Sequence, residues 1–321
     1  MDILKRNKPF IGLLLLCVAI AFVSPDFRTT GNFLIILRQT SINFIIALGM
    51  TLVILTGGID LSVGSILAFS SAVSAWLLAS GYHAGLAICA ALLIGAACGL
   101  INGIFISYGK LQPFIMTLVS MTIFRGLTLV FTDGRPINAG ENLTFEFVGN
   151  GYIFGIPFPI ILMIFLFALA YYLLNWTRFG RYIYAIGGNE DASRLAGINV
   201  EINKTAVYIA CGILSAIAGI ILTSRLAGAQ PTAGTGYELD AIAAAVVGGT
   251  SLAGGIGNIQ GTFAGALIIG VLSNALNLLK VSSYYQTIVK GLVILIAVLI
   301  DQPFGRKIVM TLLQKIKGRK L

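Results

Sequence analysis

Ten apolar runs, which recur from Phe10 almost to Ile300, constrain the fold of this chain more than any motif does. Each approaches the roughly 20 residues that an α-helix needs to cross the hydrocarbon core of a bilayer. The runs cover about residues 10–24, 39–57, 62–80, 84–106, 113–132, 158–175, 205–224, 240–253, 260–279 and 285–300. Only 10% of the 321 residues are charged, whereas a soluble domain carries about 25%. The sequence therefore predicts an all-α polytopic membrane protein with about ten transmembrane helices.

The whole chain, 1–321, is predicted to form a single transmembrane domain, because no stretch of soluble composition is long enough to form another. The eighth run differs from the others. It is short, begins near Leu239 and Asp240, and ends in glycines. A broken or re-entrant helix is expected there, which a membrane tolerates only where protein or a cavity covers it.

Lysine and arginine gather in alternate connections between the runs. Fourteen of the 21 basic residues belong to this group: Lys5, Arg6, Lys8, Lys110, Arg178, Arg181, Arg194, Lys204, Arg306, Lys307, Lys315, Lys317, Arg319 and Lys320. Positive residues in short loops stay cytoplasmic, so an even number of crossings places both termini in the cytoplasm. The formal charge of +9 reflects this bias and attraction to anionic lipid, and it implies no nucleic-acid partner.

The first run also has features of a signal peptide, namely a basic start, an apolar segment and Ala19-Ile20-Ala21. An uncleaved anchor is favoured, because the rest of the chain is membrane-like too. Cleavage would leave nine crossings and remove the parity argument for the position of the termini.

Two of the connections are long and polar. Residues 132–158 have the Gly, Asn and Pro density of an irregular surface loop. Residues 176–204 instead contain the pattern of a short capped helix, with Asn189 as N-cap, Glu190 and Asp191 at the positive end of the helix dipole, and Gly197 as the stop. A capped helix in a loop favours a docking element, and a solvated linker turn is the alternative.

Paired glycines interrupt the apolar pattern twice. The stretch LTGGIDLSVGS at 55–65 matches LAGGIGNIQGT at 252–262 at both glycine pairs, although Asp60 aligns with Gly257. The predicted helices place both stretches at the same end of the bundle. We interpret the first as a sharp break, with Asp60 to Ser62 supplying polar caps for the next helix.

Other glycines recur at helical spacing. Gly95, Gly99 and Gly103 share one face of the fourth predicted helix, and Gly261 and Gly265 share one face of the ninth. Such faces let helix backbones approach closely, so we expect them at helix contacts.

Charges inside the predicted helices need a reason, since each costs at least about 2.5 kcal/mol at the bilayer centre. Arg125 lies near the middle of the fifth run, Lys290 lies about two turns into the last, and Asp60, Glu238 and Asp240 lie at run ends. For Arg125 we favour a polar pathway or a buried partner. For the run-end residues, structural ion pairing or snorkelling is an equal alternative.

Several chemistries find no support in the sequence. The phosphate-binding pattern Gly-x-x-x-x-Gly-Lys-[Ser/Thr] is absent, and the single histidine, His83, provides no Ser-His-Asp or Cys-His set and no metal site. An enzyme is therefore disfavoured. A proton-coupled transporter would bring several acids or histidines to mid-membrane, so the sequence favours an external energy source that docks at residues 176–204.

Four long stretches carry a resemblance to a known family. They are GMTLVILTGGIDLSVGS (49–65), GRYIYAIGGNEDASRLAGINV (180–200), AQPTAGTGYELDAIAAAVVGGTSLAGG (229–255) and VSSYYQTIVKGLVIL (281–295). In this order they resemble the permease subunits of bacterial ABC sugar importers, most closely those that import ribose. The resemblance runs from about Ser24 to Asp301.

The resemblance implies an inner-membrane homodimer of ten-helix permease chains, served by a cytoplasmic ABC ATPase subunit and a periplasmic ribose-binding protein. The substrate would be D-ribose or a similar monosaccharide, moved into the cytoplasm. ATP and Mg²⁺ would be held by the ATPase, so neither cofactor nor metal is expected in this chain. Alternatives are a permease of the same superfamily for another pentose, a hexose, autoinducer-2 or a nucleoside, and a stand-alone secondary transporter or channel.

The resemblance also gives roles to three sets of residues. The coupling helix that enters a groove of the ATPase would be Asn189, Glu190, Asp191, Ala192, Ser193, Arg194, Leu195, Ala196 and Gly197. Pathway-lining candidates, with interhelical hydrogen bonds as an equal alternative, are Asn43, Asn102, Asn274 and Asn277, beside Asp60, Arg125 and Lys290 as pathway or gate residues. Candidates for docking the binding protein are Arg28, Asp133, Arg135, Glu141, Arg225 and Glu238.

Overall fold

The computed structural model describes residues 8–301, and Lys5, Arg6 and the basic residues from Arg306 to Lys320 lie outside that range. The helices are α2 (Lys8–Val23), η1 (Pro25–Arg28), α3 (Thr30–Leu55), α4 (Val63–Ala79), α5 (Ala84–Ser107), α6 (Pro113–Thr132), α7 (Leu143–Asn150), α8 (Phe158–Trp176), α9 (Arg178–Gly188), α10 (Glu190–Leu195), α11 (Val200–Leu226), α12 (Tyr237–Val247), α13 (Ile259–Leu278) and α14 (Ser283–Asp301). The strands are β1 (Ile137–Asn138), β2 (Tyr152–Ile153), β3 (Ile156–Pro157) and β4 (Gly228–Ala229). The predicted all-α class is confirmed.

Each predicted apolar run overlaps one helix, although the eighth run, 240–253, is helical only as far as Val247. The predicted count of ten membrane-crossing helices is not established by these lengths. Among residues 8–301, six helices are long and apolar enough to cross a membrane, namely α3, α5, α6, α8, α11 and α13. Three shorter apolar helices accompany them, at Pro9–Val23, Val63–Ala79 and Ser283–Ile296. These lengths make the chain a multi-pass membrane protein.

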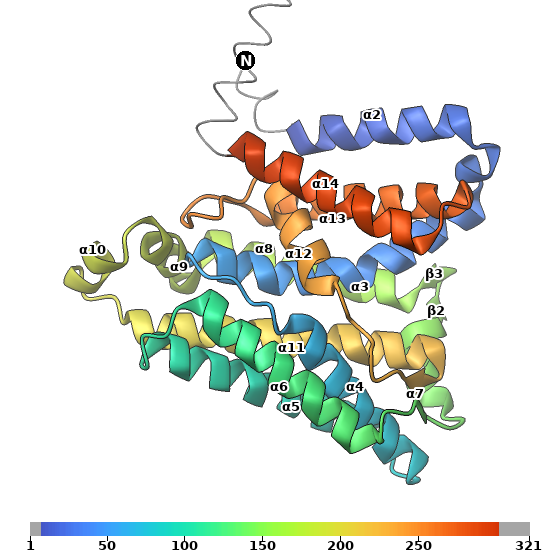
Figure 1. Cartoon of the computed structure of the whole chain (residues 1–321), viewed down its shortest axis with the longest axis horizontal. Helices are drawn as coiled ribbons and strands as arrows, with labels where there is room; N and C mark the ends of the chain where they lie inside the picture. Colours follow the sequence, from blue (N-terminus) through green and yellow to red (C-terminus); the bar gives the residue numbers. More distant parts are fainter. Residues whose placement is uncertain (1–7, 302–321) are drawn as a thin grey trace, which may run out of the picture.

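The bundle has two ends, which we call the α10 end and the α7 end. Figure 1 shows α9 and α10 at the left end, and α7, β2 and β3 at the right end. In the same view α2 begins, and α14 finishes, on the α10 side. Both ends of the described chain therefore lie on one side of the bundle.

The centre of the bundle is built on α3, α11 and α13. In each of them 61% of the spanning window is buried, against 28% in α6 and α8. An apolar helix buried on most faces belongs in the interior, whereas α6 and α8 keep apolar surface for lipid. The paired glycine stretches both lie at the α10 end, where the Gly255 N–H donates to Leu55 O across 3.0 Å.

The glycine faces lie at helix contacts, as their spacing predicts. A Cβ atom added to Gly95 or Gly99 of α5 would overlap backbone carbonyl oxygens of α11. One added to Gly261 or Gly265 of α13 would overlap carbonyl oxygens in or directly after α12. Without side chains at these positions, the backbones of the paired helices come into direct contact.

The eighth segment crosses the bundle half as loop and half as helix. At the α7 end β4 pairs antiparallel with β1, and the chain then runs without helix to Gly236 before α12 begins. With 11 residues, α12 spans about 16 Å, or half a membrane thickness. The prediction of a broken helix is confirmed.

The prediction of an irregular loop over 132–158 is wrong. That connection holds α7 and the β2–β3 hairpin, and the Asn142 side chain accepts a hydrogen bond from Phe145 N to cap α7. Phe145 is buried against α5 and α11 residues, which explains why the segment is ordered. The loop 176–204 is also more helical than predicted, because α9 precedes the capped helix.

Candidate functional site

Two non-helical segments meet in the bundle interior, at the points where α4 and α12 begin. A Cβ atom added to Gly64, in the first turn of α4, would overlap the carbonyl oxygen of Gly234. Helix N-termini carry partial positive charge, and carboxylates stand beside both: Asp60 before α4 and Glu238 in the first turn of α12. We call this region, residues 60–64 and 231–240, the polar centre.

Arg125 of α6 fastens the segment that leads into α12. Its Nη1 donates to Pro231 O at 2.7 Å and to Ala233 O at 2.8 Å. Glu238 lies near enough to interact with its charge, while Glu238 Oε1 accepts from Gly236 N at 3.2 Å. The buried partner predicted for Arg125 is thus chiefly backbone, and the contact holds a chain segment that has no helical hydrogen bonds of its own.

Asp60 ends a chain of hydrogen bonds that joins three helices. The Ser120 hydroxyl of α6 donates to Asn102 Oδ1, and Asn102 Nδ2 of α5 donates to Ser62 Oγ at 2.8 Å. Ser62 in turn donates to Asp60 Oδ1 from its hydroxyl at 2.6 Å and from its N–H at 2.9 Å. Every donor in this chain points towards the Asp60 carboxylate. Asp60 therefore stands directly before α4, as expected, but the N-cap residue Ser62 makes no side-chain cap hydrogen bond with the helix.

The other side of Asp60 faces α11. Asp60 Oδ2 accepts no hydrogen bond from a nitrogen or oxygen donor within residues 8–301, and the Tyr208 hydroxyl is likewise buried without a partner there. Tyr208 and Cys211 lie near enough to interact with the charge of Asp60. Buried polar atoms that lack partners are costly, so this face of the polar centre is held less firmly than the face towards α5.

Of the four asparagines predicted to line a pathway, only Asn102 forms a hydrogen bond with the polar centre, through Ser62. Asn274 and Asn32 exchange side-chain hydrogen bonds of 2.8 and 3.1 Å between α13 and α3. Asn277 accepts from Gln286 of α14 at 2.9 Å, and half-buried Asn43 makes no side-chain hydrogen bond among the described residues. Asn274 and Asn277 thus make the interhelical bonds of the alternative interpretation.

Lys290 forms an ion pair with Asp240, which does not take part in the hydrogen-bond chain that ends at Asp60. Its ammonium lies 2.7 Å from Asp240 Oδ2, so the pair links α14 to the first turn of α12. The ion pairing that the sequence left open is therefore present for these two residues.

The capped helix α10 projects from the α10 end (Figure 1). Asn189 Oδ1 accepts from Ala192 N at 2.9 Å, and Gly197 closes the helix with φ +80°. Glu190 pairs with Arg194 at 3.3 Å and with Lys204 of α11 at 2.8 Å. Arg194 also pairs with Glu201. These bonds hold α10 against α11, while Leu195 stays 90% exposed.

The residues predicted to dock a binding protein do not gather in one place. Asp133 and Arg135 form an exposed pair with 3.8 Å between Oδ2 and Nε, and exposed Glu141 follows them. Half-buried Arg225 lies in the last turn of α11. Glu238 lies instead in the polar centre, so its position separates it from the exposed group.

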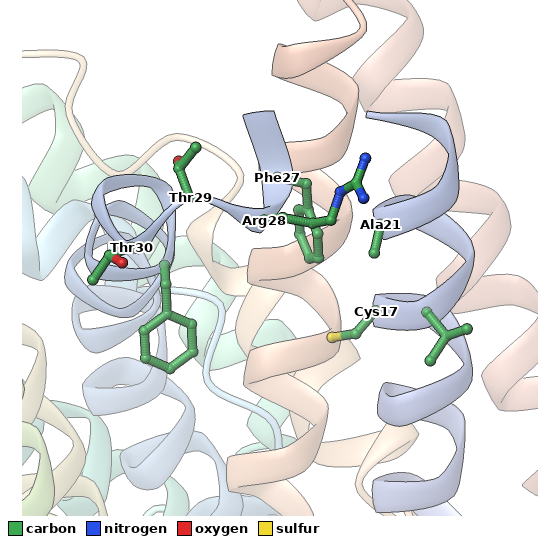
Figure 2. Close-up of a pocket in the computed structure, with 8 residues that line it drawn as sticks. Cys17, Ala21, Phe27, Arg28, Thr29 and Thr30 are labelled. Carbon is green, nitrogen blue, oxygen red and sulfur yellow. The ribbon is translucent and has the colours of Figure 1, made fainter. Parts of the chain in front are cut away.

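Arg28 lines a groove at the periphery. Figure 2 shows this groove between α2 and the start of α3, with Cys17 and Ala21 on α2 facing Phe27 and Arg28. It measures about 530 Å³ and is lined mainly by apolar atoms. No residue of the polar centre lines it, so it forms no part of an interior pathway.

Sequence reasoning missed several residues of these sites. Ser120 and Tyr208 complete the surroundings of Asp60, and Lys204 anchors Glu190. Serines in apolar helices commonly bond their own backbone, so their residue type gave no signal. Lys204, 14 residues after Glu190, was visible only as a positive charge.

Comparison with known proteins identifies the family. A family model described as branched-chain amino acid transport system / permease component matches residues 32–298. The chain belongs to this permease family. Its match spans α3 to α14 and so includes both the polar centre and α10.

Individual relatives narrow the similarity. The ribose import permease protein RbsC of Haemophilus influenzae is 55% identical, with 95% of each chain covered. That of Bacillus subtilis is 56% identical, with 94% of each chain covered. The D-allose transport system permease protein AlsC of Escherichia coli is 40% identical, over 91% of this chain and 90% of that one. No solved structure matches this permease.

Proposed function

We propose that this chain is the transmembrane subunit of an ATP-driven importer that moves ribose, or a similar monosaccharide, into the cytoplasm. The identity of 55–56% over nearly the whole chain to ribose import permeases carries the proposal. The lower identity of 40% to the D-allose permease makes that sugar a weaker alternative. In this proposal the chain has ten crossings, with α12 as the broken one, and both termini lie in the cytoplasm of a bacterium with the chain in its inner membrane.

The coupling helix is α10 with its caps, residues 189–197. An ABC ATPase subunit, which holds ATP and Mg²⁺, receives Leu195 in an apolar groove. The exposure of Leu195 and the ion pairs that fix the orientation of α10 support this assignment. A helix that is fixed to the bundle moves together with it when the ATPase changes conformation, whereas a flexible linker would not pass that movement on.

Asp60, Arg125 and Asn102 serve as gate or pathway residues at the polar centre, and the importer contains two copies of this chain. Neutral sugars need hydroxyl, amide and carbonyl partners that hold them weakly enough to let them leave. The polar centre supplies all three kinds of group at mid-bundle. A sugar-binding protein delivers the substrate at the α7 end, where Asp133, Arg135 and Glu141 are exposed and set its orientation by charge.

The deciding experiment is uptake of radiolabelled ribose into proteoliposomes that contain this permease and its ATPase. We expect uptake only when ATP is present on the side of the membrane that holds the ATPase and a ribose-binding protein is present on the opposite side. Allose and arabinose with their own binding proteins serve as competitors. Uptake by this chain alone, driven by an ion gradient, would refute the proposal.

The coupling role has its own test. Glu190→Arg replaces the negative charge that pairs with Lys204 by a positive one. Gly197→Pro replaces a glycine with φ +80°, a backbone angle that proline does not adopt. We expect both variants to yield a folded permease that no longer stimulates ATP hydrolysis by the ATPase. Normal stimulation in either folded variant would contradict the assignment of α10.

A further inference from the structure

Three glycine pairs that are far apart in sequence meet at the α10 end. They are Gly57-Gly58 after α3, Gly187-Gly188 at the end of α9, and Gly254-Gly255 in the connection from α12 to α13. We call their meeting point the glycine contact. It lies directly behind α10, because α9 ends where α10 begins.

The contact is made of backbone. A Cβ atom added to Gly187 would overlap Leu55 O and lie 2.5 Å from Gly255 N. A Cβ atom added to Gly254 would lie 3.0 Å from both Gly187 O and Gly57 N. One added to Gly255 would lie 2.8 Å from Gly188 N. Real Cβ atoms essentially never come within 3.0 Å of other atoms, so side chains are excluded at Gly187 and Gly255. A side chain at Gly254, which has φ +87°, would require its neighbours to move.

Hydrogen bonds hold the three segments together. Gly255 N donates to Leu55 O at 3.0 Å, and the Tyr184 hydroxyl of α9 donates to Gly257 O at 3.0 Å. Gly58 N donates to Val53 O at 3.1 Å, which ties the first pair to the end of α3. The segments therefore form one bonded unit with little freedom to slide.

The same unit is joined to α10 through one residue. Asn189 N donates to Ala185 O at 3.0 Å and closes α9, while Asn189 Oδ1 accepts from Ala192 N and opens α10. A displacement of α10 therefore moves α9 as well.

Both segments that α9 touches lead to the polar centre. Residues 57–58 stand two positions before Asp60, and residues 254–255 stand between α12 and α13. Gly64 lies in the first turn of α4, and Gly234 lies three residues before α12 begins. Both helices are attached to the glycine contact by a short piece of chain, α4 at its start and α12 at its end.

We propose that Gly187, Gly254 and Gly255 are positioning residues for transport: they let α9 grip both broken segments at once, so that movement of α10 shifts α4 and α12 together. This inference rests on the proposed coupling role of α10. It adds the residues that convert docking at α10 into a change at the polar centre.

Gly187 and Gly188 provide a matched pair of variants. A Cβ atom at Gly187 has no room, whereas one at Gly188 meets nothing within 4 Å. We expect Gly187→Ala to bind the ATPase and keep its stimulated hydrolysis, but to transport at least tenfold less sugar for each ATP hydrolysed. Gly188→Ala should keep the wild-type ratio of sugar to ATP. A purely structural effect would lower uptake and hydrolysis in parallel with the amount of folded protein, and that result, or an unchanged ratio, would overturn the proposal.

A distance measurement without sugar tests the glycine contact independently of which substrate the transporter carries. Spin labels at Ala185 and Ile256, both exposed, flank the glycine contact, and a label at the fully exposed Phe154 marks the α7 end. On ATP binding to the assembled transporter, without any sugar, the 185–256 distance should stay constant while the 185–154 distance changes. In Gly187→Ala, the 185–256 distance should change when ATP binds. A 185–256 distance that changes in the wild type would refute the glycine contact, whatever the substrate is.

Discussion

Lys290 of α14 lies 2.7 Å from Asp240 of α12, and this ion pair joins α14 to a helix that begins in the bundle interior. The Asp240 side chain is 7% exposed and that of Lys290 is 30% exposed. When an ion pair is shielded from water in this way, removing one charge lowers the stability of the protein more than removing both.

We expect Asp240→Asn to lower the free energy of unfolding by about 2 kcal/mol, less than the loss for a fully buried pair because Lys290 is partly solvated. The double variant Asp240→Asn with Lys290→Met leaves no unpaired charge and should regain most of that loss. The measurement is thermal unfolding of the purified permease in detergent. Equal losses in the single and double variants would contradict a coupled pair.

Arg125 is expected to control how firmly the segment before α12 is held. Arg125→Ala removes both hydrogen bonds to Pro231 and Ala233, and each bond to a charged group contributes about 1.5–3 kcal/mol. In a variant without native cysteines, exposed Thr235→Cys should then react several-fold faster with a water-soluble thiol reagent. Arg125→Lys, which keeps the charge, should fall between. A labelling rate unaffected by Arg125→Ala would rule out this restraint.

Asn102 is expected to stabilise the polar centre through its two serine partners. Asn102→Ala leaves the buried Ser120 hydroxyl without its partner, which costs about 1–3 kcal/mol. Ser62 loses one bond but still donates to Asp60. Asn43→Ala is the matched control, because Asn43 makes no side-chain hydrogen bond in the described chain, and changes of that kind stay within about 0.5 kcal/mol. Similar unfolding temperatures for the two variants would show that the hydrogen-bond chain adds no stability.

Glu190 should make the attachment of α10 depend on pH. Partial burial raises the pKa of its carboxyl, but the hydrogen bond and charge of Lys204, with smaller effects of Lys110 and Arg194, lower the pKa below its ordinary value. A lowered pKa adds stability above the ordinary glutamate pKa of about 4.3, and that stability is lost as the pH falls through the folded-state pKa.

The difference in unfolding temperature between the wild type and Glu190→Gln should therefore be largest near neutral pH and should shrink in acid. Asp191→Asn is the control, since Asp191 forms no ion pair among residues 8–301. A difference that is constant from neutral to acidic pH would exclude the Glu190–Lys204 pair as its source.

The helices were predictable from the sequence because hydrocarbon thickness fixes their length and composition. The capped helix α10 was predictable for a local reason, since Asn189 and Gly197 act within one turn of it. Even the break before α12 left a signal, because an acidic residue and glycines shortened the apolar run.

The partners of the polar residues were not predictable, because they come from distant parts of the chain. Asn274 and Asn102 have the same side chain in similar surroundings, yet one faces Asn32 and the other faces Ser62. The order of 132–158 was missed because Phe145 is buried by residues from other helices. The meeting of three glycine pairs likewise depends on the fold, although the similarity of two of them was visible.

The contact between α5 and α11 offers a last test of how glycine spacing acts in this fold. A Cβ atom at Gly99 would overlap Tyr208 O, whereas one at Gly126 of α6 meets nothing within 4 Å. Gly99→Ala must push α5 away from α11, and overpacking of this kind costs about 1–3 kcal/mol. Gly126→Ala should be neutral or stabilising by up to about 1 kcal/mol, since alanine favours helix. Thermal unfolding of both variants in the same detergent measures the difference, and an equal effect of the two substitutions would mean that α5 and α11 are not held in backbone contact.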